Sequence, residues 1–254
     1  IEDERPDFRK AIVALSTAKD KDPENLEYRQ TLAEALTSLG YATYLTGKWH
    51  AGEERLAGWP QNKGFERWFG FLNQYRLAGQ MSGGQVVPAS PTYIDPWLEG
   101  SAVAGQHYTG HLENILADAA LDVLEDLQGQ TAPWFLNLWF YAPHDPMEPA
   151  AEFAQLYPDT TDGKYRALVH QLDHNVGRIL GALEDAGYDA DTTVVYTSDH
   201  GETLGDYRCF GKNMFYEGSG RVPFILRMPK GDPDKHLMLY LHVPFCVVLC
   251  PFCS

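Results

Sequence analysis

Apolar residues recur at helical spacing in several stretches of the chain. The pattern predicts helices over residues 8–18, 31–39, 111–127 and 165–186. In the third of these the apolar residues lie on one face, as in helices that cover a core. The second is followed by Gly40, a residue suited to the position just after a helix.

Short apolar runs between these helices predict strands. They cover residues 41–46, 134–141, 193–197 and 222–227, and the continuous second run indicates a buried strand. Helices that alternate with such strands predict an α/β fold with a mainly parallel sheet flanked by helices. Residues 52–106 are rich in Gly, Pro and aromatic residues without periodicity, which predicts long surface loops with short elements.

The composition fits a folded domain with an acidic surface. The 254 residues are 44% hydrophobic and contain 20 Lys and Arg against 35 Asp and Glu, giving a formal net charge of −15. Such a surface repels phosphate backbones and anionic lipids, so we expect neither nucleic acid nor membrane as a partner. An anionic small molecule stays a candidate ligand, because a few cationic side chains or a metal ion reverse the negative electrostatic field within a cleft. The sequence assigns no cellular compartment.

Polar residues follow three of the predicted strands, at the edge where a parallel sheet binds its ligands. Lys48 and His50 flank Trp49, and in an extended segment both side chains would point the same way. A cation beside an imidazole suits an anionic group, with the histidine giving or taking a proton. The alternative is an exposed lysine and a hydrogen-bonded histidine.

The second group is His144, which lies with Asp145 between two prolines. The prolines stiffen the turn and so fix the direction of the imidazole. The alternative is a structural turn with Asp145 as its cap.

The third group is Asp199 and His200, a carboxylate and an imidazole that would suit a divalent cation. A simple Asp–His hydrogen bond is the alternative. Lys212 sits in a glycine-flanked loop, from which it would bring a second cation to the same cleft or remain solvated.

Six segments resemble the sulfatase family of the alkaline-phosphatase-like superfamily, in the family's order and over about residues 30–230. The most specific is TLAEALTSLGYATYLTGKWH, which is similar to the family's second signature. The others, in chain order, are GFERWFGF, PWFLNLWFYAPHDP, LDHNVGRIL, TTVVYTSDHGE and GKNMFYEGSGRVPFILRMP. The resemblance implies an alkaline-phosphatase-like fold and a hydrolase whose partner is a small-molecule or glycan sulfate ester.

The resemblance also implies a role for each basic residue. Lys48 would contact the sulfate and the nucleophile, and His50 would orient or deprotonate the nucleophile's hydroxyl. His144 would protonate the leaving-group oxygen or bind the sulfate, and Lys212 would be the second sulfate cation. Together these cations neutralise charge on the sulfate oxygens.

Asp199 and His200 would bind the divalent cation, usually calcium in this family, although many members have Asn at the position of His200. Sulfatases make their formylglycine nucleophile from Cys or Ser in a C/S-x-P-x-R motif, with further metal-binding aspartates upstream. No such motif occurs in the 254 residues. We therefore expect a sulfatase-like domain truncated at its N-terminus, with negligible sulfatase activity as given.

Two alternative functions stay open. A phosphodiesterase or phosphonate monoester hydrolase of the same superfamily fits the sequence Asp199-His200-Gly201-Glu202. A non-catalytic binding module fits the missing nucleophile. Residues 1–29 are predicted to be a separate charged helical segment, similar in part to one tetratricopeptide unit.

Residues 231–254 form a tail of different character. Cys246, Cys250 and Cys253 have the spacing C-x3-C-x2-C after an apolar segment. The tail resembles the start of a radical SAM domain of the coproporphyrinogen-oxidase-like branch, in which these cysteines would hold a 4Fe-4S cluster. The alternative is a hydrophobic tail with incidental cysteines.

Overall fold

The computed structural model describes residues 32–52, 55–82, 85–87 and 90–229. Two compact units make up the chain, Ile1–Leu183 and Glu184–Ser254. The predicted helix over residues 8–18, the charged segment 1–29 and the cysteine tail lie outside the described residues. Within the described part, no helix has both the length and the apolar character needed to cross a membrane.

The first unit contains both helices and strands. The helices are α2 (Leu32–Ser38), α3 (Leu112–Asp126), α4 (Ala151–Ala154) and α5 (Thr161–Asp185), which continues just past the unit's boundary. The strands are β1 (Ala42–Lys48), β2 (Arg67–Phe71), β3 (Gln80–Ser82), β4 (Gln85–Val87), β5 (Trp97–Gly100), β6 (Gln106–His107) and β7 (Trp134–Trp139). Strands β1 to β6 follow one another between α2 and α3. Single 3-10 turns occur at Leu56–Gly58, Pro60–Asn62 and Gln74–Arg76.

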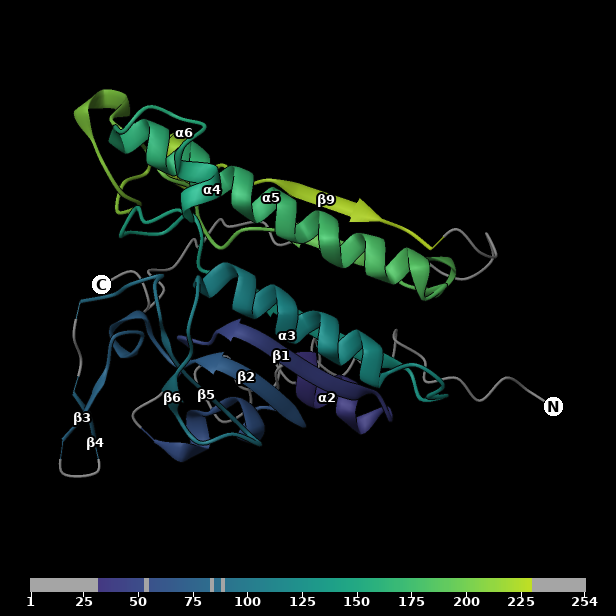
Figure 1. Cartoon of the computed structure of the whole chain (residues 1–254). Coiled ribbons are helices and arrows are strands. Elements are labelled where there is room, and N and C mark those ends of the chain that lie inside the picture. The colour runs from purple at the N-terminus through teal and green to yellow at the C-terminus, as the bar shows by residue number, and fades with distance from the viewer. Residues whose placement is uncertain (1–31, 53–54, 83–84, 88–89, 230–254) are drawn as a thin grey trace. The chain divides into compact units, whose positions relative to one another are not determined.

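A five-stranded sheet in the order β6-β5-β2-β1-β7 is the centre of this unit. Strands β6, β5, β2 and β1 are labelled in Figure 1. Strand β1 pairs in parallel with both β2 and β7, whereas β5 and β6 add an antiparallel edge. Lys48 ends β1 and the loop of His144 follows β7, both of which belong to the parallel part of the sheet. The expected α/β fold with a mainly parallel sheet is therefore confirmed. β3 and β4 form a separate antiparallel pair.

Two sequence-based expectations about strands are wrong in detail. Residues 52–106 supply two strands of the central sheet, β2 and β5, which are too short to show a periodicity. The run predicted as a buried strand over residues 134–141 ends at Trp139, and none of its strand residues is fully buried. Its position as the last strand of the sheet accounts for that exposure, because only one edge of β7 is paired within the sheet.

Two glycines let β1 pack closely between its neighbours. Gly47 of β1 lies opposite Gly70 of β2 and Trp139 of β7. Its φ of +115° is one that glycine tolerates best, and a Cβ there would lie 1.9 Å from the carbonyl oxygen of Trp139. A Cβ on Gly70 would lie 2.0 Å from the carbonyl oxygen of Gly47. The backbone that leads into Lys48 therefore requires glycine.

Apolar side chains cover both faces of the sheet. On one face Leu45 and Trp68 pack with Ala33 of α2. On the other face Phe71 packs with Leu112 of α3 and Leu168 of α5. Residues of β2 therefore serve opposite cores, as the alternation of side chains along a strand allows.

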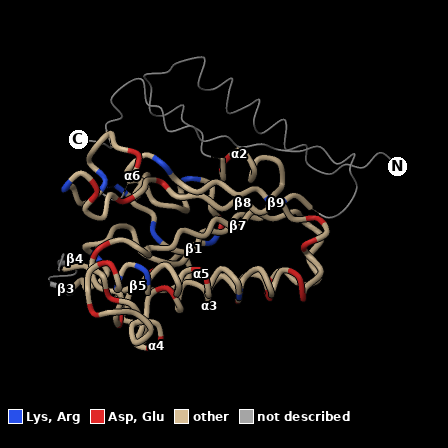
Figure 2. Tube along the Cα trace, turned by 90° about the horizontal axis from the view of Figure 1, so that it is seen from above, with Lys and Arg blue, Asp and Glu red and all other residues tan. Residues whose placement is uncertain are grey.

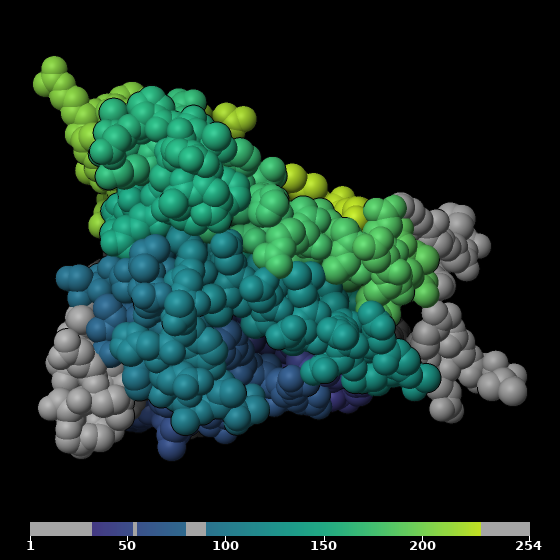
Figure 3. All heavy atoms as spheres, viewed as in Figure 1, coloured from purple at the N-terminus to yellow at the C-terminus, as the bar shows by residue number. Residues whose placement is uncertain are grey.

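Helices α3 and α5 are joined by polar contacts as well as by this core. Arg178 of α5 donates to Asp118 of α3 at 2.6 Å, and the two helices adjoin in the space-filling view (Figure 3). Residues of both charge signs are spaced along α5 (Figure 2). The predicted helices 111–127 and 165–186 are thus confirmed, although α5 starts at Thr161.

The second unit has fewer regular elements in its described part. β8 (Val194–Thr197) pairs in antiparallel fashion with β9 (Phe224–Arg227). Short helical turns lie at Tyr188–Ala190 and Asp206–Arg208, and α6 covers Glu217–Gly220. Both predicted strands, 193–197 and 222–227, are therefore present within a residue or two.

Candidate functional site

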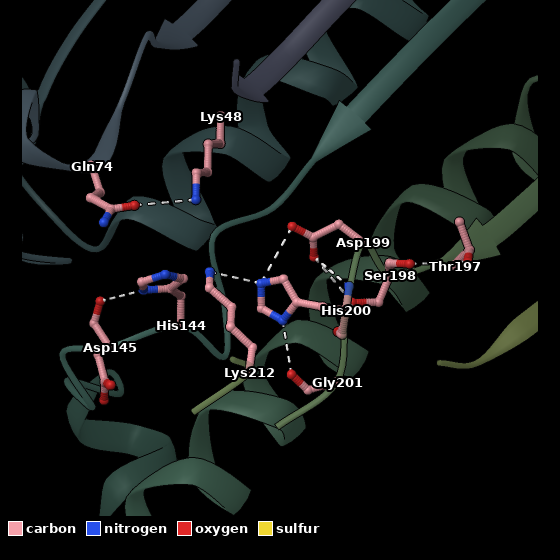
Figure 4. Close-up of polar contacts among 10 residues, drawn as sticks. All are labelled: Lys48, Gln74, His144, Asp145, Thr197, Ser198, Asp199, His200, Gly201 and Lys212. Atoms are coloured by element: carbon pink, nitrogen blue, oxygen red, sulfur yellow. Dashed lines mark hydrogen bonds and ion pairs between the residues drawn. The ribbon is translucent and has the colours of Figure 1, made fainter. Parts of the chain in front are cut away.

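Lys48 is the last residue of β1, so the sheet itself sets the start of its side chain. Its Nζ donates a hydrogen bond to Oε1 of Gln74 at 3.3 Å (Figure 4). The same Nζ lies 5.5 Å from the centroid of the Tyr141 ring, within the range of a cation–π contact. The ammonium is thus held at the carboxyl end of the parallel strands.

His144 lies in the loop that follows β7, and its ring stacks on the same Tyr141. The two ring centroids are 4.8 Å apart and the planes differ by 20°. Nδ1 of His144 bonds to the backbone carbonyl of Asp145 at 2.8 Å, so this nitrogen carries the hydrogen and Nε2 carries the lone pair of the neutral ring (Figure 4). Lys48 and His144, far apart in sequence, therefore share one aromatic neighbour.

Tyr141 was not singled out by the sequence. It ends an apolar run and has the pattern of a core aromatic, and at 3% exposure it is indeed buried. Its hydroxyl donates to the carbonyl of Asp145. Burial, together with nearby acidic groups such as Asp145, raises the pKa of Tyr141 well above its usual value, so the ring stays neutral. No sequence signal distinguishes such a bridging aromatic from an ordinary core residue.

Buried polar groups hold the backbone of the His144 loop. Tyr93, which is fully buried, donates its hydroxyl hydrogen to the carbonyl of His144 at 2.8 Å. Glu113 of α3 accepts hydrogen bonds from the backbone N–H groups of Tyr141 at 3.0 Å and Ala142 at 2.9 Å. Burial raises the pKa of Glu113 to about 7, although these two hydrogen bonds lower it in part.

The end of the loop is fixed by a second polar set. Nε2 of His111 bonds to the carbonyl of Glu148 at 2.9 Å, and the amide oxygen of Gln171 accepts from the N–H of Ala150 at 3.0 Å. The Nδ1 of His111 accepts from Gln171 at 3.0 Å, which identifies the neutral ring. Burial lowers the pKa of His111, in agreement with that neutral form.

His50 lies two residues beyond the end of β1, where the backbone changes direction. The common direction predicted for Lys48 and His50 requires an extended segment, and the backbone is not extended at His50. The φ of His50 is +48°, and its N–H donates to the carbonyl of Leu72 at 2.7 Å. Its side chain is exposed, whereas Trp49 between them is buried.

Asp199, His200 and Lys212 belong to the second unit, and contacts join all three. Nζ of Lys212 lies 2.9 Å from Nε2 of His200, and Oδ2 of Asp199 lies 3.5 Å from that same nitrogen (Figure 4). Nδ1 of His200 bonds to the carbonyl of Gly201 at 2.8 Å and so carries the hydrogen. Nε2 therefore accepts from the lysine.

This arrangement fits a bound divalent cation only in part. The carboxylate of Asp199 is 78% exposed and is a suitable oxygen ligand for calcium. The lone pair of His200 Nε2, however, already accepts from Lys212. No group of three or more His, Cys, Asp or Glu side chains in the described residues forms a metal cluster. The described side chains thus supply an incomplete ligand shell.

Comparison with known proteins gives one consistent family. The family model described as Sulfatase matches residues 11–245. N-acetylgalactosamine-6-sulfatase from Sus scrofa is 32% identical over 232 residues, which cover 84% of this chain. Those residues span 41% of that protein, so the chain covers less than half the length of this curated relative.

Solved structures agree with the fold. Ps i-CgsB in complex with k-i-k-neocarrahexaose superposes with a TM-score of 0.67 at 25% identity, over 80% of this chain and 48% of that one. The phosphonate monoester hydrolase of Agrobacterium radiobacter superposes with a TM-score of 0.51 at 24% identity, over 78% of this chain and 52% of that one. The second likeness concerns the fold alone.

Proposed function

The chain belongs to the sulfatase family, and from this premise we propose that its described residues form the sulfate-binding part of a metal-dependent sulfuric-ester hydrolase. The observation that carries the proposal is the pair Lys48 and His144, which both contact the ring of Tyr141. A fixed ammonium beside an imidazole suits an anionic ester whose alcohol must leave with a proton.

Each of these residues has a defined task in this proposal. The ammonium of Lys48 offsets charge on the sulfate oxygens. In the proposed step the oxygen of the nucleophile forms a bond to sulfur as the bond between sulfur and the ester oxygen breaks, and His144, when protonated, gives the departing ester oxygen its proton. Nδ1 of His144 donates a hydrogen bond to the backbone carbonyl of Asp145. Nε2 is therefore the nitrogen that would carry the transferred proton. His50 would orient or deprotonate the hydroxyl of the nucleophile.

Lys212 would be the second cation on the sulfate, and Asp199 with His200 would hold the divalent cation, which in this family is usually calcium. The bound cation would supply charge neutralisation at the sulfate and the nucleophile. His200 would first have to give up its contact with Lys212, so Asp199 is the better of the two candidate ligands. We expect calcium to raise the unfolding temperature of this chain, because a cation held by the folded state stabilises it, and Asp199→Asn should abolish the increase. An unfolding temperature that calcium leaves unchanged would contradict the proposed cation role and favour a non-catalytic binding module.

Sulfate binding is the direct test of the proposed pair. In NMR spectra, titration with sodium sulfate at constant ionic strength should shift the ring signals of His144, and Lys48→Ala should remove the shift. Lys164→Ala is the matched control, since Lys164 is an exposed lysine of the same unit paired with Asp159. Equal shifts in all three proteins would refute the proposed role of the pair.

The 254 residues contain no C/S-x-P-x-R sequence, and we infer that they do not hydrolyse sulfate esters by themselves. The purified chain with 4-nitrophenyl sulfate and calcium should release nitrophenol at the rate of buffer alone. Metal-dependent release above that rate would overturn this inference.

For the substrate we propose a sulfated sugar. The named relative acts on N-acetylgalactosamine-6-sulfate by its name, and the structure named above holds k-i-k-neocarrahexaose by its title. The alternative is a phosphate or phosphonate ester. If inorganic phosphate shifts the His144 signals at lower concentration than sulfate does, the alternative is favoured.

The cysteine tail receives a separate proposal, that Cys246, Cys250 and Cys253 bind a 4Fe-4S cluster. The match to the sulfatase family ends at residue 245, directly before the first of these cysteines. Anaerobic reconstitution should give iron in the wild-type chain and less in Cys246→Ala. Unchanged iron content would refute the cluster.

A further inference from the structure

Glu113 is a buried carboxylate that touches the backbone of the His144 loop at its start. The residue has 0% exposure and lies in the first turn of α3. Its Oε1 accepts two hydrogen bonds, from the N–H groups of Tyr141 and Ala142. Its Oε2 is buried and has no hydrogen-bond partner among the described residues. Burying a carboxylate is costly, so an apolar side chain would be preferred if filling space were its only task.

The two N–H groups lie where the chain leaves β7 for the loop. The Tyr141 ring attached to this backbone stacks on His144 and faces the ammonium of Lys48. The N–H of His144 in turn donates to the carbonyl of Tyr141 at 3.0 Å. Fixing the backbone at Tyr141 and Ala142 therefore fixes the aromatic ring on which both candidate residues rest.

We propose that Glu113 is a positioning residue for His144, acting through its two hydrogen bonds to the backbone of Tyr141 and Ala142. This inference rests on the proposed function, because it gives His144 a task. Glu113 itself touches neither the sulfate nor the ester in this proposal. It acts by holding the loop, as a buried supporting group does for a functional side chain.

The groups around Glu113 make its charge state sensitive to pH. The ionisable groups that interact with Glu113 include Tyr93 and Tyr141, whose raised pKa values keep both rings neutral. They also include His111, whose Nδ1 accepts from the N–H of Glu113. The acidic groups of Asp145 and Glu148 act on both tyrosines. Since burial raises the pKa of Glu113 to about 7, its two hydrogen bonds weaken as pH falls through neutrality.

NMR on the whole chain tests the proposal without turnover. In the wild type the amide signals of Tyr141 and Ala142, the two direct donors to Glu113, should each show a titration inflection with a midpoint near pH 7. In Glu113→Gln, which keeps an oxygen acceptor but no charge, both inflections should disappear. Glu125→Gln is the matched control, an exposed glutamate on the same helix, and it should leave both inflections in place.

Glu113→Ala gives the larger effect. The two amides should exchange with solvent about tenfold faster, since a hydrogen bond of ordinary strength is lost at each, and the His144 ring signals should lose the upfield shift caused by the Tyr141 ring. A folded Glu113→Ala protein with unchanged amide exchange and unchanged His144 signals would overturn the proposal. If Glu113→Ala does not fold, Glu113→Gln is the test of the proposal. Amide inflections of Tyr141 and Ala142 that persist in Glu113→Gln overturn the proposal, and their loss supports it.

These outcomes are separate from those of the proposed function. If sulfate fails to shift the His144 signals, the sulfate-binding role is refuted. The amide signals of Tyr141 and Ala142 still report whether Glu113 holds the loop.

Discussion

The two units support their candidate residues in different ways. In the first unit, Lys48 leaves a sheet with cores on both faces, and His144 rests on buried Tyr141 and Tyr93. In the second unit, no residue of β8 or β9 is fully buried, and the loop after β8 contains aromatic residues such as Phe210, at 72% exposure.

The difference concerns what fixes a side chain in place. Buried hydrogen bonds hold the backbone around His144, so its ring needs little ordering when a ligand binds. Asp199, His200 and Lys212 contact one another, and His200 also contacts its chain neighbours Ser198 and Gly201. A two-stranded pair such as β8 and β9 is by itself only marginally stable. We infer that the candidate residues of the first unit are more preorganised than those of the second unit.

The largest predicted effect is a loss of stability in β1, the strand that ends at Lys48. Gly47→Ala should destabilise the first unit by about 3 kcal/mol or more, because the new methyl group meets the Trp139 carbonyl and the φ of +115° is unfavourable for alanine. Urea unfolding followed by tryptophan fluorescence measures this unit, since all 6 tryptophans lie within it.

Gly129→Ala is the control for Gly47→Ala. Gly129 has a φ of +78°, but a Cβ added there would meet no atom within 4 Å. The substitution should cost about 1 kcal/mol, from backbone strain alone. Equal losses in the two variants would contradict the close packing of β1 against β7.

The second prediction concerns the pH dependence of stability. The pKa of Glu113 rises from 4.5 to about 7 on folding, so the folded chain binds the proton more tightly than the unfolded chain. Its contribution to stability is fully present below pH 4.5, and about 3 kcal/mol is lost as pH rises to about 7. Glu113→Gln should remove this slope, and Glu125→Gln should keep it. If the pH dependence of stability persists in Glu113→Gln, a group other than Glu113 is responsible for it.

A smaller effect is expected at Tyr93. Tyr93→Phe removes the hydrogen bond to the His144 carbonyl and should cost about 1 kcal/mol in the same unfolding experiment. Tyr75→Phe is the control, because Tyr75 is 50% exposed, and it should cost nothing measurable. Indistinguishable values for the two variants would mean that the Tyr93 hydroxyl does not hold the loop.

The smallest effect is expected in the second unit. Lys212→Ala should change the exchange rate of the Gly201 amide by less than about threefold, because contacts between partly exposed charged groups contribute little. The nitrogen shift of His200 Nε2 should nevertheless change, since the lysine no longer donates to it. A large loss of protection would show that Lys212 holds this unit together.

Much of the architecture could be predicted from the sequence. The apolar stripe over residues 111–127 and the run after Gly40 predicted helix α3 and strand β1 nearly at their observed bounds. β2 and β5 could not be predicted, because four or five residues with a glycine show no clear period. Their place in the sheet depends on pairing between segments that lie far apart in the sequence.

The candidate side chains could be predicted, but their supports could not. Lys48, His144 and Asp199 are polar residues at or after the ends of strands, and Lys212 is a lysine in a glycine-flanked loop, so they stand out. Glu113 and Tyr141 do not, because a glutamate in the first turn of a helix and an aromatic residue after a strand are ordinary features. Only the fold shows that they meet.

The central claim is that buried groups preorganise the loop of His144, while the second unit holds its residues loosely. Native-state hydrogen exchange on the whole chain at neutral pH tests it most directly. The amides of Tyr141 and Ala142 should exchange at least about tenfold more slowly than those of Gly201 and Thr203, which donate to the carbonyls of Ser219 and Gly211, because Tyr141 and Ala142 share one buried acceptor and open together. Equal exchange in the two regions, or faster exchange at Tyr141 and Ala142, would contradict the account.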